Sequence, residues 1–253
     1  MTNGNDTEPT NEDELDFTNL FDESDCKLTD TSHFPVNKYK PTNEITVKRV
    51  YHLGRLISKI LHKHNIPYWV TGGTLLGCVR HKGLIPWDDD LDICLLDKHE
   101  DEFYSLCNVF LENDIVLKEA FSGYSLYHRT ESVPSHNPAD NDLLDYRFPF
   151  CDVFIMRENF ESSDRFEIRN GRSRTCWTNE WYLKSEVEPL KEMLFGDFYF
   201  MAVNNPTPYL HRTYGKDCMQ VGKTHNYNHI TRSSMQSETI DTSKGFQPAK
   251  PFN

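Results

Sequence analysis

A pair of glycines marks the part of the sequence that is suited to phosphate chemistry. Residues 68–70 (YWV) predict a short buried strand, and Gly72 and Gly73 follow closely behind it. Glycines allow a tight turn and a close approach of the backbone to an anion, and Thr74 can cap the helix that follows. Because most glycine pairs are simply turns, this run predicts a phosphate cradle only together with a second group of residues.

The second group is the acidic run of residues 85–92 (IPWDDDLD). On a strand, side chains alternate between two faces, so Asp90 and Asp92 project together while their apolar neighbours enter the core. Two carboxylates on one face suit a hard divalent cation such as Mg²⁺. A solvated surface run is the common alternative, but these carboxylates enter an apolar strand, where unpaired charges are costly. An EF-hand calcium loop is set aside because, counted from Asp88, the sixth position is not Gly and the twelfth is not Glu.

Amphipathic and alternating segments must position these two runs. Residues 43–64 have apolar side chains at helical spacing and predict a helix that packs on a sheet, and residues 103–111 predict a second helix. Short alternating segments near residues 115–117, 124–129 and 150–156 are expected to complete the sheet. The predicted fold class is therefore α+β, with a small mixed β-sheet flanked by helices.

The charge of the chain is concentrated at its start. Residues 1–30 hold ten acidic side chains and one basic side chain, which accounts for −9 of the net charge of −12. This segment has few large apolar residues, so we expect residues 1–40 to form a disordered acidic tail. The remainder is nearly neutral, which argues against a large nucleic-acid interface. Residues 41–225 are expected to form one domain, and residues 226–253 a loose polar tail.

Cysteine usage and hydropathy bear on the compartment. The cysteines are odd in number and form no CxxC pair, which is typical of reduced thiols and argues against a disulfide scaffold or zinc knuckle. No apolar run reaches the roughly 18 residues of a membrane span, and the first residues show no signal-peptide pattern. We therefore expect a cytoplasmic protein, or one of the secretory pathway if the start is truncated. The seven cysteines are Cys26, Cys78, Cys94, Cys107, Cys151, Cys176 and Cys218.

The glycine turn and the acidic run together resemble the central motif of the LicD family, which includes fukutin and fukutin-related protein, within the nucleotidyltransferase-fold superfamily. The resemblance rests on residues 72–77 (GGTLLG), Arg80 and residues 85–93 (IPWDDDLDI). The superfamily pattern is a glycine turn, a helix, and then two carboxylates on a strand. The segment thus implies a nucleotidyltransferase-like fold.

The resemblance extends to a closing segment but has two departures. Residues 195–198 (FGDF) and 209–217 (YLHRTYGKD) are similar to the family's last conserved part, so the match covers about residues 43–220. Cys218 stands where the family often has a tryptophan. The cysteine-rich zinc insertion of the fukutin-related branch is missing, so the resemblance implies no structural zinc.

The resemblance also implies the site. Asp90 and Asp92 match the first two catalytic carboxylates, and Asp152, in the apolar strand pattern CDVFI, is the candidate for the third. All three would bind Mg²⁺ or Mn²⁺. The residues expected to contact the phosphates of the donor are Gly72, Gly73, Thr74, Arg80 and Lys82.

For the LicD family the resemblance implies transfer of a phospho-alcohol, such as phosphocholine or ribitol phosphate, from a CDP-linked donor to a sugar hydroxyl, as in the synthesis of glycoproteins or lipopolysaccharides. The expected partners are a nucleotide-activated small molecule and a glycan acceptor. The first alternative is transfer of NMP from an NTP with release of pyrophosphate. A GT-A glycosyltransferase and an inactive scaffold rank third. A GT-A fold needs a longer nucleotide-binding region before the motif, and a scaffold predicts the loss of one or more carboxylates, whereas all three candidates are present.

Overall fold

The computed structural model describes residues 40–135, 146–224, 227–242 and 247–252. The predicted acidic tail, residues 1–40, lies outside the described residues except for Lys40. Among the residues that are described, no helix is long and apolar enough to cross a membrane.

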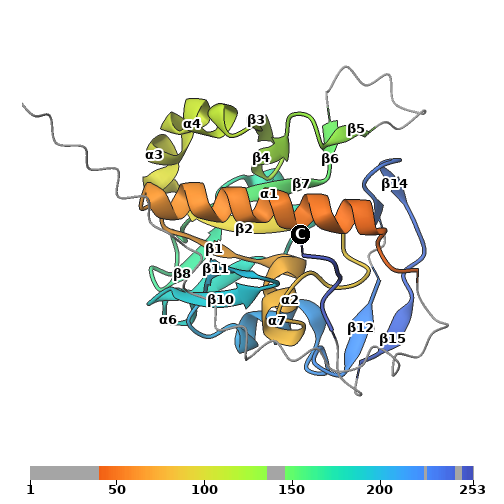
Figure 1. Cartoon of the computed structure of the whole chain (residues 1–253). Coiled ribbons are helices and arrows are strands. Elements are labelled where there is room, and N and C mark those ends of the chain that lie inside the picture. The colour runs from red at the N-terminus through yellow and green to blue at the C-terminus, as the bar shows by residue number, and fades with distance from the viewer. Residues whose placement is uncertain (1–39, 136–145, 225–226, 243–246, 253) are drawn as a thin grey trace, which may run out of the picture. The chain divides into compact units, whose positions relative to one another are not determined.

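A mixed sheet of seven strands forms the centre of the described chain (Figure 1). Five strands follow the order β1-β2-β7-β4-β3, and β8 and β9 extend the sheet from β7. Strands β2 and β7 are parallel, and all other pairs in this sheet are antiparallel. The predicted α+β class with a mixed sheet is confirmed. The strands span Tyr68–Val70 (β1), Leu91–Leu96 (β2), Ile115–Ala120 (β3), Gly123–His128 (β4), Phe150–Glu158 (β7), Arg165–Ile168 (β8) and Trp181–Leu183 (β9).

The predicted first helix is confirmed as α1, Glu44–Lys63. The side chain of Asn43 caps it by accepting a hydrogen bond from Thr46 N at 2.9 Å. Its apolar face is fully buried at Val50 and Ile57, and the helix contacts β7 and β11 (Figure 1). Burial of such a face supplies most of the stability of a helix in a protein.

The predicted second helix is broken into two. Helices α3 (Glu100–Ser105) and α4 (Cys107–Glu112) meet at Leu106, whose backbone leaves the helical conformation. The apolar spacing that predicted one helix is still used, because Phe103 and Phe110 are fully buried on either side of the break. The remaining helices are η4 (Asp97–His99), α2 (Gly72–Arg80), α5 (Gly171–Cys176), α6 (Lys184–Val187) and α7 (Thr207–Tyr214).

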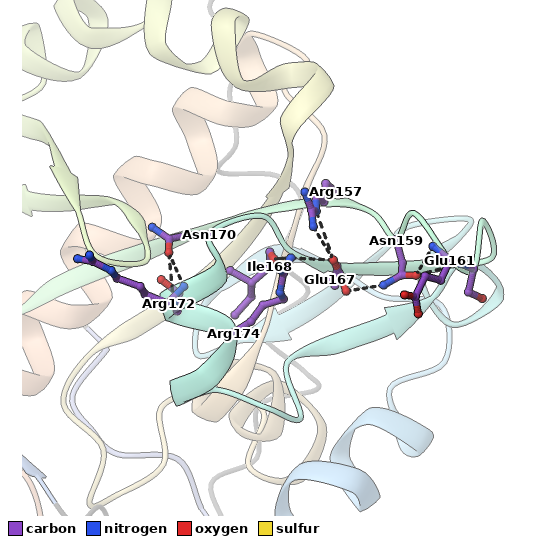
Figure 2. Close-up of polar contacts among 10 residues, drawn as sticks. Arg157, Asn159, Glu161, Glu167, Ile168, Asn170, Arg172 and Arg174 are labelled. Carbon is purple, nitrogen blue, oxygen red and sulfur yellow. Dashed lines mark hydrogen bonds and ion pairs between the residues drawn. The ribbon is translucent and has the colours of Figure 1, made fainter.

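Strand β8 is held by a buried charged residue, Glu167 (Figure 2). Its carboxylate accepts hydrogen bonds from Arg174 Nη1 at 2.7 Å, from Arg157 Nη2 at 3.0 Å and from Asn159 Nδ2 at 2.6 Å. Helix α5 follows directly, capped by the side chain of Asn170. Because these contacts join β7, β8 and α5, they fix the chain that leads to β9.

Residues 226–253 were predicted to be a loose tail, and in their described part most side chains are exposed or half-buried while a few are buried against the domain. Strands β12 (Val221–Lys223) and β15 (Thr239–Asp241) pair, and Ile240, the middle residue of β15, is 2% exposed. Tyr51 of α1 donates a hydrogen bond to Ala249 O at 3.0 Å. The polar composition hid these contacts because only a few apolar residues of the region are buried. The other two-stranded pairs are β5 (Val133–Ser135) with β6 (Tyr146–Phe148), β10 (Lys191–Phe195) with β11 (Phe198–Ala202), and β13 (Tyr227–Asn228) with β14 (Ser233–Ser234).

Candidate functional site

Two of the predicted carboxylates lie side by side on adjacent strands. Asp92 of β2 is the register partner of Asp152 on β7, so both side chains leave the same face of the sheet. Asp90 lies just before β2 and is close enough to raise the pKa of both. On the other side of β7, Asp152 is paired with Ser125 of β4. The structure therefore brings Asp90, Asp92 and Asp152 together.

Burial and mutual repulsion change how these carboxyl groups titrate. Burial raises the pKa of Asp152 to about 7, with a further contribution from Asp90, against hydrogen bonds from Ser125 and Ser122 that lower it. Burial also raises the pKa of Asp92, and the charges of Asp90 and Asp152 add to the increase. Several buried carboxylates at one place are costly unless positive charge compensates them. A set of hard oxygen ligands under mutual repulsion fits a divalent cation such as Mg²⁺ or Mn²⁺.

The glycine turn packs directly against two carboxylates. Gly72 has a φ of +55°, a conformation that favours glycine, and a Cβ added there would lie 2.7 Å from Asp92 Oδ2. A Cβ at Gly73 would lie 2.5 Å from Asp88 Oδ2. Asp88, which was not among the predicted site residues, is thus part of the cluster. The N-terminus of α2, which has a partial positive charge, faces these carboxylates.

Thr74 has a different position from the one predicted. The N-cap of α2 is Thr71, and neither residue's side chain caps the helix. The Thr74 hydroxyl instead accepts a hydrogen bond from Asp92 N at 2.9 Å, and Thr71 N donates to Asp92 O at 3.1 Å. Both threonines therefore hold the glycine turn in register with the strand that contains Asp92.

A buried glutamate, Glu180, supports the turn from behind. Its carboxyl group accepts hydrogen bonds from the Thr71 hydroxyl and, at 2.6 Å, from the Tyr209 hydroxyl. Tyr209 in turn accepts a hydrogen bond from Gly72 N at 3.1 Å. Burial raises the pKa of Glu180, although these hydrogen bonds oppose the increase. Sequence reasoning missed this residue because it lies 109 positions from Thr71.

The two predicted basic residues lie at and beyond the opposite end of α2 from the glycine turn. The Arg80 guanidinium, at the last residue of α2, donates to Cys218 O at 2.7 Å, and burial lowers its pKa to about 10. Lys82 follows the end of the helix, and its ammonium donates to Val79 O at 3.3 Å at the surface. With about 1.5 Å of rise per residue, the first and last residues of α2, Gly72 and Arg80, are roughly 12 Å apart along the helix, and Lys82 lies beyond that end. The structure thus ties Arg80 to the segment that follows α7, and the charge of Asp88 also acts on its guanidinium. The hydrogen bond of the Lys82 ammonium goes to the end of α2.

His229, in the predicted loose tail, lies against the acidic run. Its Nδ1 is 2.8 Å from Asp89 Oδ1, and its Nε2 is 3.6 Å from Asp90 Oδ2. Burial alone would lower the pKa of His229, but Asp90 and Asp89 raise it to about 9. No local pattern in the sequence predicts this residue, because it lies 140 positions from Asp89.

A cavity of about 330 Å³ opens beside the acidic run. Its walls come from the chain before α1, from the acidic run and from the C-terminal region. Because Asp89 lines it, the cavity lies close to the carboxylate cluster and is large enough for a small molecule. Its lining includes Thr42, Trp87, Asp89, Phe148, Ile230 and Glu238.

Comparison with known protein families gives a match over the region that contains the cluster. The model described as "LicD/FKTN/FKRP, nucleotidyltransferase domain" matches residues 65–205. These residues include the glycine turn and the carboxylates that the structure gathers, which are Asp88, Asp89, Asp90, Asp92 and Asp152. His229 and the C-terminal wall of the cavity lie outside the matched region.

Individual relatives match to different extents. An uncharacterized protein of Rickettsia typhi is 28% identical over 222 residues, which is 86% of this chain and 63% of that protein. The lipopolysaccharide cholinephosphotransferase LicD of Haemophilus influenzae is 42% identical over 53 residues, 21% of this chain and 19% of that protein. The human ribitol 5-phosphate transferase FKRP is 44% identical over 39 residues, 15% of this chain and 8% of that protein.

This chain covers only part of the length of its relatives, and its structure resembles the solved structures only in part. The chain spans somewhat less than two thirds of the length of the Rickettsia typhi relative. Among solved structures, ANT(2")-Ia in complex with adenylyl-2"-tobramycin shows a TM-score of 0.36 and 13% identity, with 61% of this chain and 68% of that chain covered.

Proposed function

This chain belongs to the LicD/FKTN/FKRP nucleotidyltransferase domain family, and on that premise we propose that it transfers a phospho-alcohol from a CDP-linked donor to a sugar hydroxyl of a glycan. The observation that supports this most is the pairing of Asp92 with Asp152 beside the glycine turn. The reaction would release CMP. Phosphocholine and ribitol phosphate are the two groups that we propose for transfer, because two relatives have names that refer to them.

The proposed cation-binding residues are Asp90, Asp92 and Asp152, on which the structure concentrates negative charge. Bound Mg²⁺ or Mn²⁺ would neutralise the donor phosphates and the charge that develops during transfer. The glycine turn already faces Asp88 and Asp92. A phosphate could therefore approach the turn only when a bound cation compensates the negative charge of these carboxylates. This explains why the glycine turn and the carboxylates need to be adjacent.

The other residues position the donor and the turn. We propose that main-chain N–H groups at Gly73 and Thr74, at the start of α2, bind phosphate oxygens. Thr71 and Tyr209, both bonded to Glu180, would keep the turn in place while the donor binds. Arg80 would act indirectly, by holding the segment at Cys218, and Lys82 has no role in this proposal.

Nucleotidyl transfer from an NTP is the second candidate, since the family description itself names a nucleotidyltransferase domain. The same carboxylates serve both reactions, but the product differs. Attack at the alcohol-bearing phosphorus of a CDP-alcohol releases CMP, whereas attack at the α-phosphorus of an NTP releases pyrophosphate.

Phosphorus NMR of the reaction mixture distinguishes the two candidates. The protein is incubated with Mg²⁺, a panel of glycans and either CDP-choline, CDP-ribitol or an NTP. We expect CMP to appear with a CDP-alcohol, and to be absent with Asp92→Asn but present with Asp101→Asn, which changes an exposed aspartate on α3. Pyrophosphate from an NTP, without CMP from either CDP-alcohol, would favour the second candidate.

A further inference from the structure

His229 presents each of its two ring nitrogens to a different carboxylate of the acidic run. Nδ1 is 2.8 Å from Asp89 Oδ1, which is hydrogen-bonding distance. Nε2 faces Asp90 Oδ2 at 3.6 Å, which is longer than a normal hydrogen bond. The ring therefore has a close partner on one side and a wider gap on the side of the proposed cation-binding residues.

Aromatic neighbours fix the plane of the imidazole. Phe148 stacks on it with ring centroids 6.1 Å apart and an angle of 23°, and Phe150 meets it edge-on at 5.2 Å. The Tyr227 ring contacts it with ring centroids 5.5 Å apart. The His229 side chain is 18% exposed. The backbone is held as well, because the Ser135 hydroxyl donates a hydrogen bond to His229 O. The orientation of Nε2 toward Asp90 is thus set by packing from β6, β7 and β13.

This arrangement matches the way proteins hold a metal-binding histidine. Such a histidine commonly donates a hydrogen bond from one ring nitrogen to a carboxylate, while the other nitrogen binds the metal. Two ligand atoms that share one cation, each about 2.0–2.2 Å from it, lie roughly 3 Å apart. The separation of 3.6 Å between His229 Nε2 and Asp90 Oδ2 is close to this value.

We propose that His229 is a ligand of the cation that Asp90 helps to bind, and that Asp89 orients its ring. This inference rests on the cation site of the proposed function. It adds to the carboxylates a nitrogen ligand from outside the family-matched residues 65–205. Mg²⁺ is bound almost entirely through oxygen, whereas transition metals accept imidazole readily. The added ligand therefore shifts the preference of this chain from Mg²⁺ toward Mn²⁺.

One other cluster of the described residues could supply an imidazole and must be controlled for. His52 of α1, His128 of β4 and Glu131 place ligand atoms within 4.8 Å of one another, and His52 Nδ1 is 2.9 Å from Glu131 Oε2. His52→Gln is therefore the matched control for His229→Gln. It removes a partly exposed histidine that also pairs with a carboxylate but belongs to a cluster separate from that of Asp89, Asp90 and His229.

Pulsed electron paramagnetic resonance of Mn²⁺ bound to the full chain tests the proposal directly. We expect echo modulation from a coordinated ¹⁴N nucleus in the wild-type protein, and its replacement by a ¹⁵N pattern when only histidine is labelled with ¹⁵N. The signal should disappear in His229→Gln and remain in His52→Gln. Wild-type protein without nitrogen modulation, or a signal that survives when His229→Gln is combined with His52→Gln, would overturn the proposal, and the wild-type measurement holds even if a variant does not fold.

Metal titrations by calorimetry provide a second readout. His229→Gln should weaken Mn²⁺ binding about tenfold and Mg²⁺ binding by less than twofold, and Asp89→Asn should weaken Mn²⁺ binding about tenfold, as expected for loss of an orienting carboxylate. An equal effect of His229→Gln on both ions would overturn the inference, because it would show that the imidazole acts only through its charge. If Mn²⁺ does not bind the wild-type protein at all, the cation site of the proposed function itself fails.

Discussion

At the scale of single residues, the site consists of carboxylates placed where their charges oppose one another. Asp92 and Asp152 are register partners, and Asp88 and Asp92 both face the glycine turn. A protein keeps such an arrangement at a cost in stability, and perturbed carboxyl groups of this kind are concentrated at functional sites. The same carboxylates therefore lower the stability of the metal-free protein and bind the cation in the proposed function.

The repulsion among these residues predicts that Asp152→Asn stabilises the metal-free protein at neutral pH. The pKa of Asp152 is raised to about 7, so the folded state loses stability as the pH rises through that value. Removal of the charge should raise the free energy of unfolding by on the order of 1–3 kcal/mol at pH 8. Urea unfolding in EDTA checks this, and the advantage of the variant should shrink as the pH is lowered toward 5. A variant that is less stable than the wild type at pH 8 would show that the carboxylate is compensated.

The close approach of Gly73 to Asp88 gives a second prediction. Gly73→Ala adds a Cβ that would lie 2.5 Å from Asp88 Oδ2, so the carboxylate or the turn must move. We expect Mn²⁺ affinity to fall at least about tenfold while stability changes by about 1 kcal/mol. Gly171→Ala is the matched control, since its nearest neighbour would be Arg174 Nη2 at 3.7 Å. Unchanged Mn²⁺ binding in calorimetry with Gly73→Ala would show that the turn tolerates a side chain.

At the scale of elements, β7 organises the molecule because it contacts three other strands. Its first half pairs with β4 on one edge and with β2 on the other, and its last residues pair with β8. Asp152 lies in the first half, and the contacts around Glu167 secure the last residues. The position of Asp152 thus depends on the same strand that the charged residues in Figure 2 hold.

The charged contacts of β8 predict a pH dependence opposite to that of Asp152. Burial acts to raise the pKa of Glu167, but hydrogen bonds from Asn159 and Arg157 and the charge of Arg174 hold it below its ordinary value. Its stabilisation is therefore present above the unfolded pKa and is lost as the pH falls through the folded pKa. Glu167→Gln should lower the free energy of unfolding by about 1–3 kcal/mol at pH 7. Thermal unfolding at pH 7 and pH 3.5 measures this, and an equal loss at both would contradict the assignment to ionised Glu167.

At the scale of the whole molecule, the described C-terminal region completes both the core and the site. Ile240 of β15 is buried, Ala249 accepts a hydrogen bond from Tyr51, and His229 lies on the acidic run. The family match ends before all of these residues, at residue 205. The region therefore adds to the core and to the acidic run residues that lie outside the match to the family model.

The packing of this region is tested by Ile240→Ala. Ile240 is 2% exposed, so its truncation should cost about 2–4 kcal/mol in the free energy of unfolding. Ile230→Ala is the control because Ile230 is 47% exposed, and its effect should stay within about 0.5 kcal/mol. Equal, small effects in chemical denaturation would show that the region is as loose as its composition suggests.

Local sequence patterns predicted those site residues that lie in one short stretch of sequence or in one strand pattern. The glycine turn, Asp90 and Asp92 belong to one short stretch of sequence, and Asp152 was found because it interrupts an apolar strand. Contacts between distant segments escaped prediction: Glu180 reaches the turn from 109 positions away, and His229 reaches the acidic run from 140. Their partners are set by tertiary packing, which composition and periodicity do not encode.

Lys82 and the break at Leu106 show that local sequence patterns do not predict where the chain goes in space. Lys82 is near the motif in sequence, but it lies beyond the C-terminal end of α2, whose first residues are the two glycines. The spacing of residues 103–111 fits one helix, yet the chain turns at Leu106 while still burying the same apolar side chains. The spacing of apolar residues therefore predicts which side chains are buried better than it predicts the path of the chain.

The most direct test of the account is the binding of CDP-choline measured by calorimetry, with and without Mn²⁺, in the wild-type protein and in Asp92→Asn. The account predicts binding that requires Mn²⁺ in the wild type and is lost in Asp92→Asn, while the variant remains folded by circular dichroism. Asp92→Asn removes one charge from the cluster that the cation would compensate, so its effect on the fold should be small or stabilising. Binding of equal strength in EDTA, or Mn²⁺-dependent binding that survives in Asp92→Asn, would contradict the central claim that these carboxylates hold the cation that binds the donor.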